Sequence, residues 1–199
     1  LGTKAAAHFL KLIKTAVEKK AGIHFDRYTS ERKDIRDKKF IEKTLKLFTD
    51  IHATYEADGA LWLRTTDHGD DKDRVLVTSD KAPTYFLADA GHYLETKKRG
   101  FDGKILILGP DHYGYVSRIQ AAAKTVGLKE SEVIITQAVL LMRGGKEFKM
   151  SKRKGLFVTF GELVEEVGRD AARFFFLMIS PDTHMDLSLI HISEPTRPE

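Results

Sequence analysis

The chain has 199 residues, of which 42% are hydrophobic and 31% are charged, and its formal net charge is +4. This balance supports a buried core and excludes a wholly disordered protein. The absence of cysteine excludes a disulfide scaffold and a cysteine-ligated zinc site. No apolar run approaches the ~20 residues that cross a bilayer, so no membrane partner is expected.

Hydrophobic spacing predicts two amphipathic helices near the start of the chain. Phe9, Ile13 and Val17 recur at helical spacing within the first, over 5–20, and the second is predicted over 40–55. A turn and a short strand are expected between them, over 21–26. The cations of this region alternate with acids, which is typical of solvated helix faces.

A hairpin and a helix are predicted next. Asp58-Gly59 is a turn signal that leads into a strand over 60–66. A short strand is predicted over 75–79. Pro83 precedes a helix that we expect over 84–98.

The clearest strand is ILIL over 105–108, a continuous apolar run that we expect to be buried on both faces. A helix over 115–126 follows, and then a second apolar run over 133–142. Strand, helix and strand in this order predict an α/β domain with a parallel sheet. Ligands of such sheets bind beyond the carboxyl ends of the strands, where GPDHYGY (109–115) and a basic loop lie.

Two helices are predicted after the basic loop, over 161–167 and 170–178. The second contains FFF at 174–176, which we expect to be largely buried.

The basic loop, RGGKEFKMSKRKG over 143–155, holds six lysines and arginines against one glutamate. Lys149 and Lys152 are three residues apart, so their ammonium groups can converge on a polyphosphate, and Ser151 adds a hydroxyl donor. Such a clamp would stabilise the negative charge of a departing pyrophosphate. A basic surface loop without a ligand is the alternative interpretation.

KMSKR at 149–153 is similar to the KMSKS-type signature of class I aminoacyl-tRNA synthetases. Three longer blocks resemble arginyl-tRNA synthetases in particular, and in the right order: DGALWLRTTDHGDDKDRVLVTSDKAPTYFLADAGHY, RGFDGKILILGPDHYGYVSRIQAA and LMRGGKEFKMSKRKGLFVTFGELVEEVGRDAARFFFLMISPDTHMD. The resemblance covers most of 22–187. It implies an α/β fold, namely an incomplete Rossmann-like catalytic domain with a parallel sheet and an N-terminal mixed α/β insertion region.

The resemblance implies a cytoplasmic arginine–tRNA ligase. Such an enzyme activates arginine with ATP to give arginyl-adenylate and pyrophosphate, and then transfers the arginyl group to tRNA. The implied partners are arginine and an arginine-accepting tRNA, Mg²⁺ accompanies the ATP, and no structural metal is expected. Catalysis would consist mostly of positioning and charge stabilisation.

Tyr85 and Asp89 are four residues apart on the predicted helix and therefore share a face. A carboxylate can hold a guanidinium by a charge-assisted pair, and a tyrosine beside it can lie against the planar cation. The two residues match the family's TYxxxD pattern, which implies arginine binding. Without that match, an acid on a helix surface near a core aromatic would be the simpler interpretation.

GPDHYGY follows a strand and opens a helix, where backbone N–H groups suit a nucleotide. The family pattern here is G-A-D-H-H-G-[HY], from which Pro110 and Tyr113 depart. The resemblance implies catalysis by Lys149 and Lys152. It implies ATP binding by Gly109, Asp111, His112, Gly114, Met150 and Ser151.

By the same resemblance, we expect 1–74 to be the connective or insertion part and 75–187 the C-terminal half of the catalytic domain with the KMSKR loop. Residues 188–199 resemble a translated cloning adapter, and we expect a non-native tail. His-x-Gly-His, the family's other ATP signature, does not occur in the chain, because HYGY at 112–115 ends in Tyr115. We therefore expect a central slice that does not aminoacylate tRNA alone.

Two alternatives stay open. A non-catalytic tRNA or nucleic-acid-binding module would use the basic loop and N-terminal helices for salt-dependent phosphate contacts. A class I synthetase for another amino acid, such as cysteine, is the second. The missing Cys and His zinc ligands and the Tyr85 and Asp89 pair argue against it.

Overall fold

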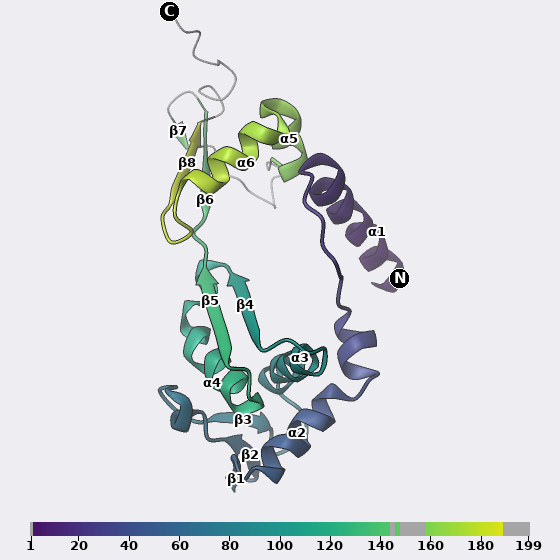
Figure 1. Ribbon diagram of the computed structural model, residues 1–199, viewed down its shortest axis with the longest axis vertical. Coiled ribbons are helices and arrows are strands. Elements are labelled where there is room, and N and C mark those ends of the chain that lie inside the picture. Colours follow the sequence, from purple (N-terminus) through teal and green to yellow (C-terminus); the bar gives the residue numbers. More distant parts are fainter. Residues whose placement is uncertain (1, 144–145, 148–157, 189–199) are drawn as a thin grey trace, which may run out of the picture. The chain divides into compact units, whose positions relative to one another are not determined.

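A computed structural model describes residues 2–143, 146–147 and 158–188 (Figure 1). The chain forms two compact units. One comprises 29–136, and the other comprises 1–28 together with the chain from 137 onward. The predicted division at residue 74 separates parts by function, which the compact units do not test, so it remains a prediction. The predicted non-native tail over 188–199 also remains a prediction, because 189–199 lie outside the described residues.

The first sheet of the 29–136 unit is antiparallel, in the order β1 (Thr54–Ala57), β2 (Ala60–Leu63) and β3 (Arg74–Val77). Asp58 and Gly59 join β1 to β2 with φ of 52° and 73°, as a two-residue hairpin turn with left-handed residues requires. The predicted hairpin is thus confirmed.

Helix α2 (Phe40–Asp50) is shorter than predicted. The helix ends because His52 adopts a φ of 57°, and the chain then enters β1. The predicted extension to residue 55 is therefore wrong, since Tyr55 lies in a strand and pairs with Trp62.

The second sheet is the predicted parallel pair. Strand β4 (Gly103–Leu108) and strand β5 (Glu130–Ile135) pair from Gly103 opposite Glu130 to Leu108 opposite Ile135. A 3₁₀ segment, Pro110–Tyr115, and helix α4 (Val116–Val126) connect them (Figure 1). Gly127, with φ of 86°, ends α4 as expected.

Two expectations about these strands are wrong. Ile105 and Ile107 are 64% and 65% exposed, while Leu106 and Leu108 pack against the core, so only one face of β4 is covered within the described residues. The apolar run over 133–142 is not one strand either. It is divided between β5 and a strand of the other unit.

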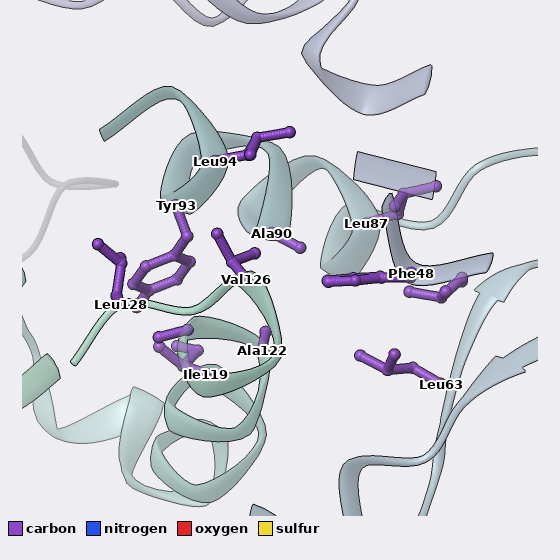
Figure 2. Close-up of a cluster of buried hydrophobic side chains, with 12 residues drawn as sticks. Phe48, Leu63, Leu87, Ala90, Tyr93, Leu94, Ile119, Ala122, Val126 and Leu128 are labelled. Atoms are coloured by element: carbon purple, nitrogen blue, oxygen red, sulfur yellow. The ribbon is translucent and has the colours of Figure 1, made fainter. Parts of the chain in front are cut away.

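Helix α3 (Tyr85–Lys98) lies at the centre of the core. Figure 2 shows its Ala90 and Tyr93 facing Ile119, Ala122 and Val126 of α4. Further along the cluster, Leu87 meets residues from α2 and β2, namely Phe48 and Leu63. Because one face of α3 is buried in this cluster, the opposite face of the helix must point away from the core.

A π-helical turn, Glu31–Arg36, packs closely on α3. Its Ile35 is fully buried. A Cβ added at Gly91 would lie only 3.4 Å from Ile35 Cγ2 and 3.5 Å from the backbone carbon of Phe40. The turn therefore packs directly over Gly91 in the middle of α3, with room there for little more than a methyl group.

The part of the other unit that the structure describes contains four helical segments and a mixed sheet. The helical segments are α1 (Gly2–Lys14), the π-helical Thr15–Lys20, α5 (Phe160–Val167) and α6 (Arg169–Met178). The sheet has the order β7 (Lys146–Glu147), β6 (Val139–Arg143) and β8 (Met185–Ser188), with β6 parallel to β8.

The helices predicted for this unit are confirmed, but the strand over 21–26 is not formed. Lys20 pairs with Glu165 at 2.8 Å, and Arg173 Nη1 donates to the carbonyls of Ala21 and Gly22 at 3.2 Å. Phe174 is 62% exposed, so the expected burial of the three phenylalanines is wrong for this one. Among the residues that the structure describes, none of the helices has the length and hydrophobicity to span a membrane.

A buried ion pair fastens the β1–β3 sheet to α4. Arg74 donates from Nε to Asp70 Oδ2 at 2.7 Å and from Nη2 to Asp70 Oδ1 at 2.8 Å, and Ser117 of α4 donates to Asp70 Oδ1 at 2.8 Å. The Asp70 side chain is fully buried. Burial opposes ionisation of Asp70, but the hydrogen bonds from Arg74 and Ser117 outweigh it and hold its pKa well below the ordinary range.

Replacing Asp70 by Asn is expected to lower the free energy of unfolding by about 3–5 kcal/mol, because the nearly buried Arg74 loses its main charged partner. The pKa is lowered in the folded chain, so the stabilisation is present above the ordinary value of 3.8 and is lost as the pH falls below it. Urea unfolding followed by circular dichroism measures the change. Asp71→Asn is the control, because its side chain is 70% exposed. Equal midpoints for the two variants would contradict the prediction.

Candidate functional site

Helix α3 presents Tyr85 and Asp89 on its open face. Its first turn is anchored by Thr84, whose Oγ1 accepts from Leu87 N at 3.3 Å and donates to the carbonyl of Val75 at 2.9 Å. Tyr85 is 88% exposed, and Asp89, one turn later, is also exposed. The structure thus brings these two predicted residues together on one helix face, as expected.

The Asp89 carboxylate makes no hydrogen bond or ion pair with any residue that the structure describes. Although the side chain is open to solvent, the surrounding protein removes part of its hydration, which raises its pKa. The negative charge of Glu31 raises that pKa further, while Lys104 and His112 lower it. A carboxylate that is partly desolvated and unpaired gains stability from an added cation.

Two charged neighbours of Asp89, Glu31 and Lys104, were not predicted from the sequence. Burial lowers the pKa of His92 and of Lys104, and the Lys104 ammonium lies 4.6 Å from the centroid of the Tyr93 ring. His92 lies three residues after Asp89 on α3, a spacing that indicates a neighbour. Glu31 and Lys104 come from distant parts of the chain, and no local signal indicates them.

The GPDHYGY motif lies beyond the carboxyl end of β4, where parallel sheets bind ligands. A Cβ added at Gly109 would lie 2.9 Å from Asp111 Oδ1, so a larger residue there would have to displace the exposed Asp111 carboxylate. Asp111, His112 and Gly114 are exposed. His112 Nε2 lies 3.6 Å from Asp111 Oδ2, and the charge of His112 acts on Asp89. The structure therefore brings the motif within electrostatic reach of α3.

The predicted phosphate clamp lies outside the described residues. Lys149, Met150, Ser151 and Lys152 fall in the stretch 148–157. Their roles, and their approach to Asp89, stay predictions. Among the described residues, no group of three or more His, Asp or Glu side chains is placed to hold a metal ion.

Two hollows in the 29–136 unit differ in their relation to the site. One, of about 380 Å³, is lined by Arg36, Ile41, Pro83, Thr84, Tyr85 and Ala88. Another, of about 710 Å³, is lined by α2, α3 and Val126 and includes neither Tyr85 nor Asp89. The smaller hollow is the one next to the predicted site residues.

The chain is similar in sequence to arginine–tRNA ligases. The relative from Legionella pneumophila (strain Corby) is 48% identical over 170 residues, covering 84% of this chain and 29% of the relative. The relative from Frankia alni is 47% identical over 178 residues, covering 88% of this chain and 32% of the relative. The chain thus spans about a third of the length of the curated relatives it matches. No protein-family model matches it.

The fold is similar to that of solved arginyl-tRNA synthetases. The Campylobacter jejuni structure matches with a TM-score of 0.84 and 33% identity, covering 96% of this chain and 42% of that one. The Plasmodium falciparum arginyl-tRNA synthetase matches with a TM-score of 0.68, covering 99% of this chain and 36% of that one, at 15% identity, which shows the fold alone.

The parallel β4–β5 pair and these likenesses define the class: part of the Rossmann-like catalytic domain of a class I aminoacyl-tRNA synthetase. The predicted α/β fold is confirmed. Within that class, the chain belongs to the arginyl-tRNA synthetase family, as the three sequence blocks predicted.

Replacing Asp89 by Asn is expected to keep or raise the melting temperature at neutral pH. Because the pKa of Asp89 is raised in the folded chain, the unfolded chain loses that proton more readily, and stability falls as the pH rises from 3.8 through the raised value. Asparagine cannot ionise, so the variant does not lose this stability at neutral pH. Thermal unfolding at neutral and acidic pH measures the effect, which should disappear at acidic pH. A clear loss of stability at neutral pH would instead assign Asp89 a structural role.

Proposed function

We propose that this chain is the arginine-recognition part of an enzyme that attaches arginine to its tRNA through an arginyl-adenylate. The single observation that carries the proposal is the Asp89 carboxylate, unpaired among the described residues and beside the exposed Tyr85. The sequence similarity to arginine–tRNA ligases supports it. We place the enzyme in the cytoplasm.

The guanidinium of arginine binds the Asp89 carboxylate by a charge-assisted pair. Tyr85 lies one helical turn away and can stack on the planar cation or hydrogen-bond to it. Glu31 adds a second negative charge near Asp89, which favours a cation over a neutral side chain. These groups select a positively charged amino acid and hold it in place.

ATP binds beyond the end of β4, at Gly109, Asp111, His112 and Gly114, and at Met150 and Ser151 of the basic loop. The arginine carboxylate attacks the α-phosphorus, and the bond to the departing pyrophosphate breaks. Lys149 and Lys152 stabilise the negative charge that develops on pyrophosphate. Mg²⁺ enters as the ATP complex and shields the phosphates. A ribose hydroxyl of tRNA then accepts the arginyl group, and AMP leaves.

In a complete arginine–tRNA ligase that carries this segment, Asp89→Asn is expected to raise the KM for arginine about 10- to 100-fold, because a charge-assisted hydrogen bond is lost. The KM for ATP should change little, since the nucleotide binds elsewhere. Arginine-dependent pyrophosphate exchange measures both constants. An increase in the KM for ATP of the same size would contradict the assignment.

In the same enzyme, Lys149→Ala is expected to slow arginine activation about 100-fold, because one of two charges on the departing pyrophosphate is removed. The same substitution should weaken tRNA binding by no more than the loss of about one phosphate contact. Single-turnover activation and a tRNA binding titration measure the two effects. Equal effects on both would favour the alternative of a nucleic-acid-binding module.

A further inference from the structure

The Glu31–Arg36 turn already contains a guanidinium next to the proposed arginine site. Arg36 contacts Glu31 Oε1 through two nitrogens, Nε at 2.8 Å and Nη2 at 2.6 Å. The two side chains are 46% and 53% exposed, so the pair is open to solvent. An exposed pair of this kind is weak and is easily exchanged for another partner.

The turn that carries this pair is held against α3. Ile35, between Glu31 and Arg36, is fully buried, and its Cγ2 would meet a Cβ at Gly91, two residues after Asp89. Arg36 also lines the 380 Å³ hollow together with Tyr85 and Ala88. Arg36 therefore lies beside Tyr85 at the start of α3. The buried Ile35 holds the backbone of the turn there, while the Arg36 side chain, 46% exposed, is free to turn.

Glu31 is close enough to Asp89 for its negative charge to act on that carboxylate. A ligand guanidinium at Asp89 would also be attracted to Glu31. In the chain without ligand, however, Glu31 is engaged by Arg36. The guanidinium of Arg36 and the guanidinium of a bound arginine would thus compete for the same carboxylate, that of Glu31.

We propose that Arg36 is an internal competitor that lowers the affinity of the site for arginine by occupying Glu31. This inference rests on the proposed function, since it requires arginine to bind at Asp89. When arginine binds, Glu31 exchanges Arg36 for the ligand guanidinium, and Arg36 turns to solvent. The side chain acts through Glu31 and sets affinity without entering the chemistry.

The test is a titration of the full 199-residue chain with L-arginine, followed residue by residue with ¹H–¹⁵N NMR. Arg36→Gln is expected to bind arginine about two- to fivefold more tightly than the wild type, which corresponds to the release of one exposed ion pair. Arg36→Lys keeps the charge and the pairing and should bind like the wild type. Thermal unfolding of each variant shows whether the fold is intact.

Lys38→Ala is the matched control for charge. Lys38 lies on the same segment and pairs with Asp34 at 2.9 Å, so its removal changes the net charge equally without freeing Glu31. Its arginine affinity should equal that of the wild type. A gain equal to that of Arg36→Gln would show a general electrostatic effect and would overturn the proposal.

A double-mutant cycle with Glu31→Gln separates competition from all other effects of Arg36. With Glu31 removed, Arg36→Gln should no longer change the affinity, since there is no acceptor to release. Tighter binding in that background, or no tightening in the wild-type background, overturns the competitor role while arginine binding itself stands. If neither the wild type nor Arg36→Gln binds arginine, the proposed function fails instead.

Discussion

The fourteen residues of helix α3 both pack into the core and carry the candidate site on the opposite face. Its inner face packs Leu87, Ala90 and Tyr93 into the cluster of Figure 2, and this packing leaves no freedom in the direction of the outer face. Thr84 fixes the start of the helix to β3 by hydrogen bonds to backbone carbonyls. The outer face therefore presents Tyr85 and Asp89 at a defined position, which is what recognition by positioning requires.

The local signals of the sequence predict most of the elements around the site. Asp58-Gly59 specifies the hairpin because both positions need left-handed backbone, and Gly127 specifies the end of α4 for the same reason. Two apolar runs separated by a segment of helical spacing predict the parallel pair of β4 and β5, because a helix is the usual connection between parallel strands. The spacing places Tyr85 and Asp89 on one face of α3, but the family resemblance was needed to select them and to give them a role, which stays a prediction.

The features that the sequence did not predict carry no recognisable local signal. The end of α2 at Asp50 follows from a left-handed residue, His52, that carries no turn signal. One face of β4 is exposed because no described element packs on it, and an apolar run in the sequence does not show which elements will cover a strand. Glu31 lies near Asp89 because its turn packs on Gly91, and Lys104 because it belongs to β4, so both depend on the tertiary structure. No periodicity within the chain marks such residues.

Asp70 and Asp89 show how the same side chain is used in two ways. Asp70 is buried with Arg74 and Ser117, and its pKa is lowered because hydrogen bonds exceed the cost of desolvation. Asp89 is desolvated without such hydrogen bonds, so its pKa is raised. The first arrangement holds α4, and with it the end of the GPDHYGY motif two residues away, in place. The second leaves a partly desolvated carboxylate without a hydrogen bond or ion pair among the described residues, which is the arrangement that the proposed arginine site needs.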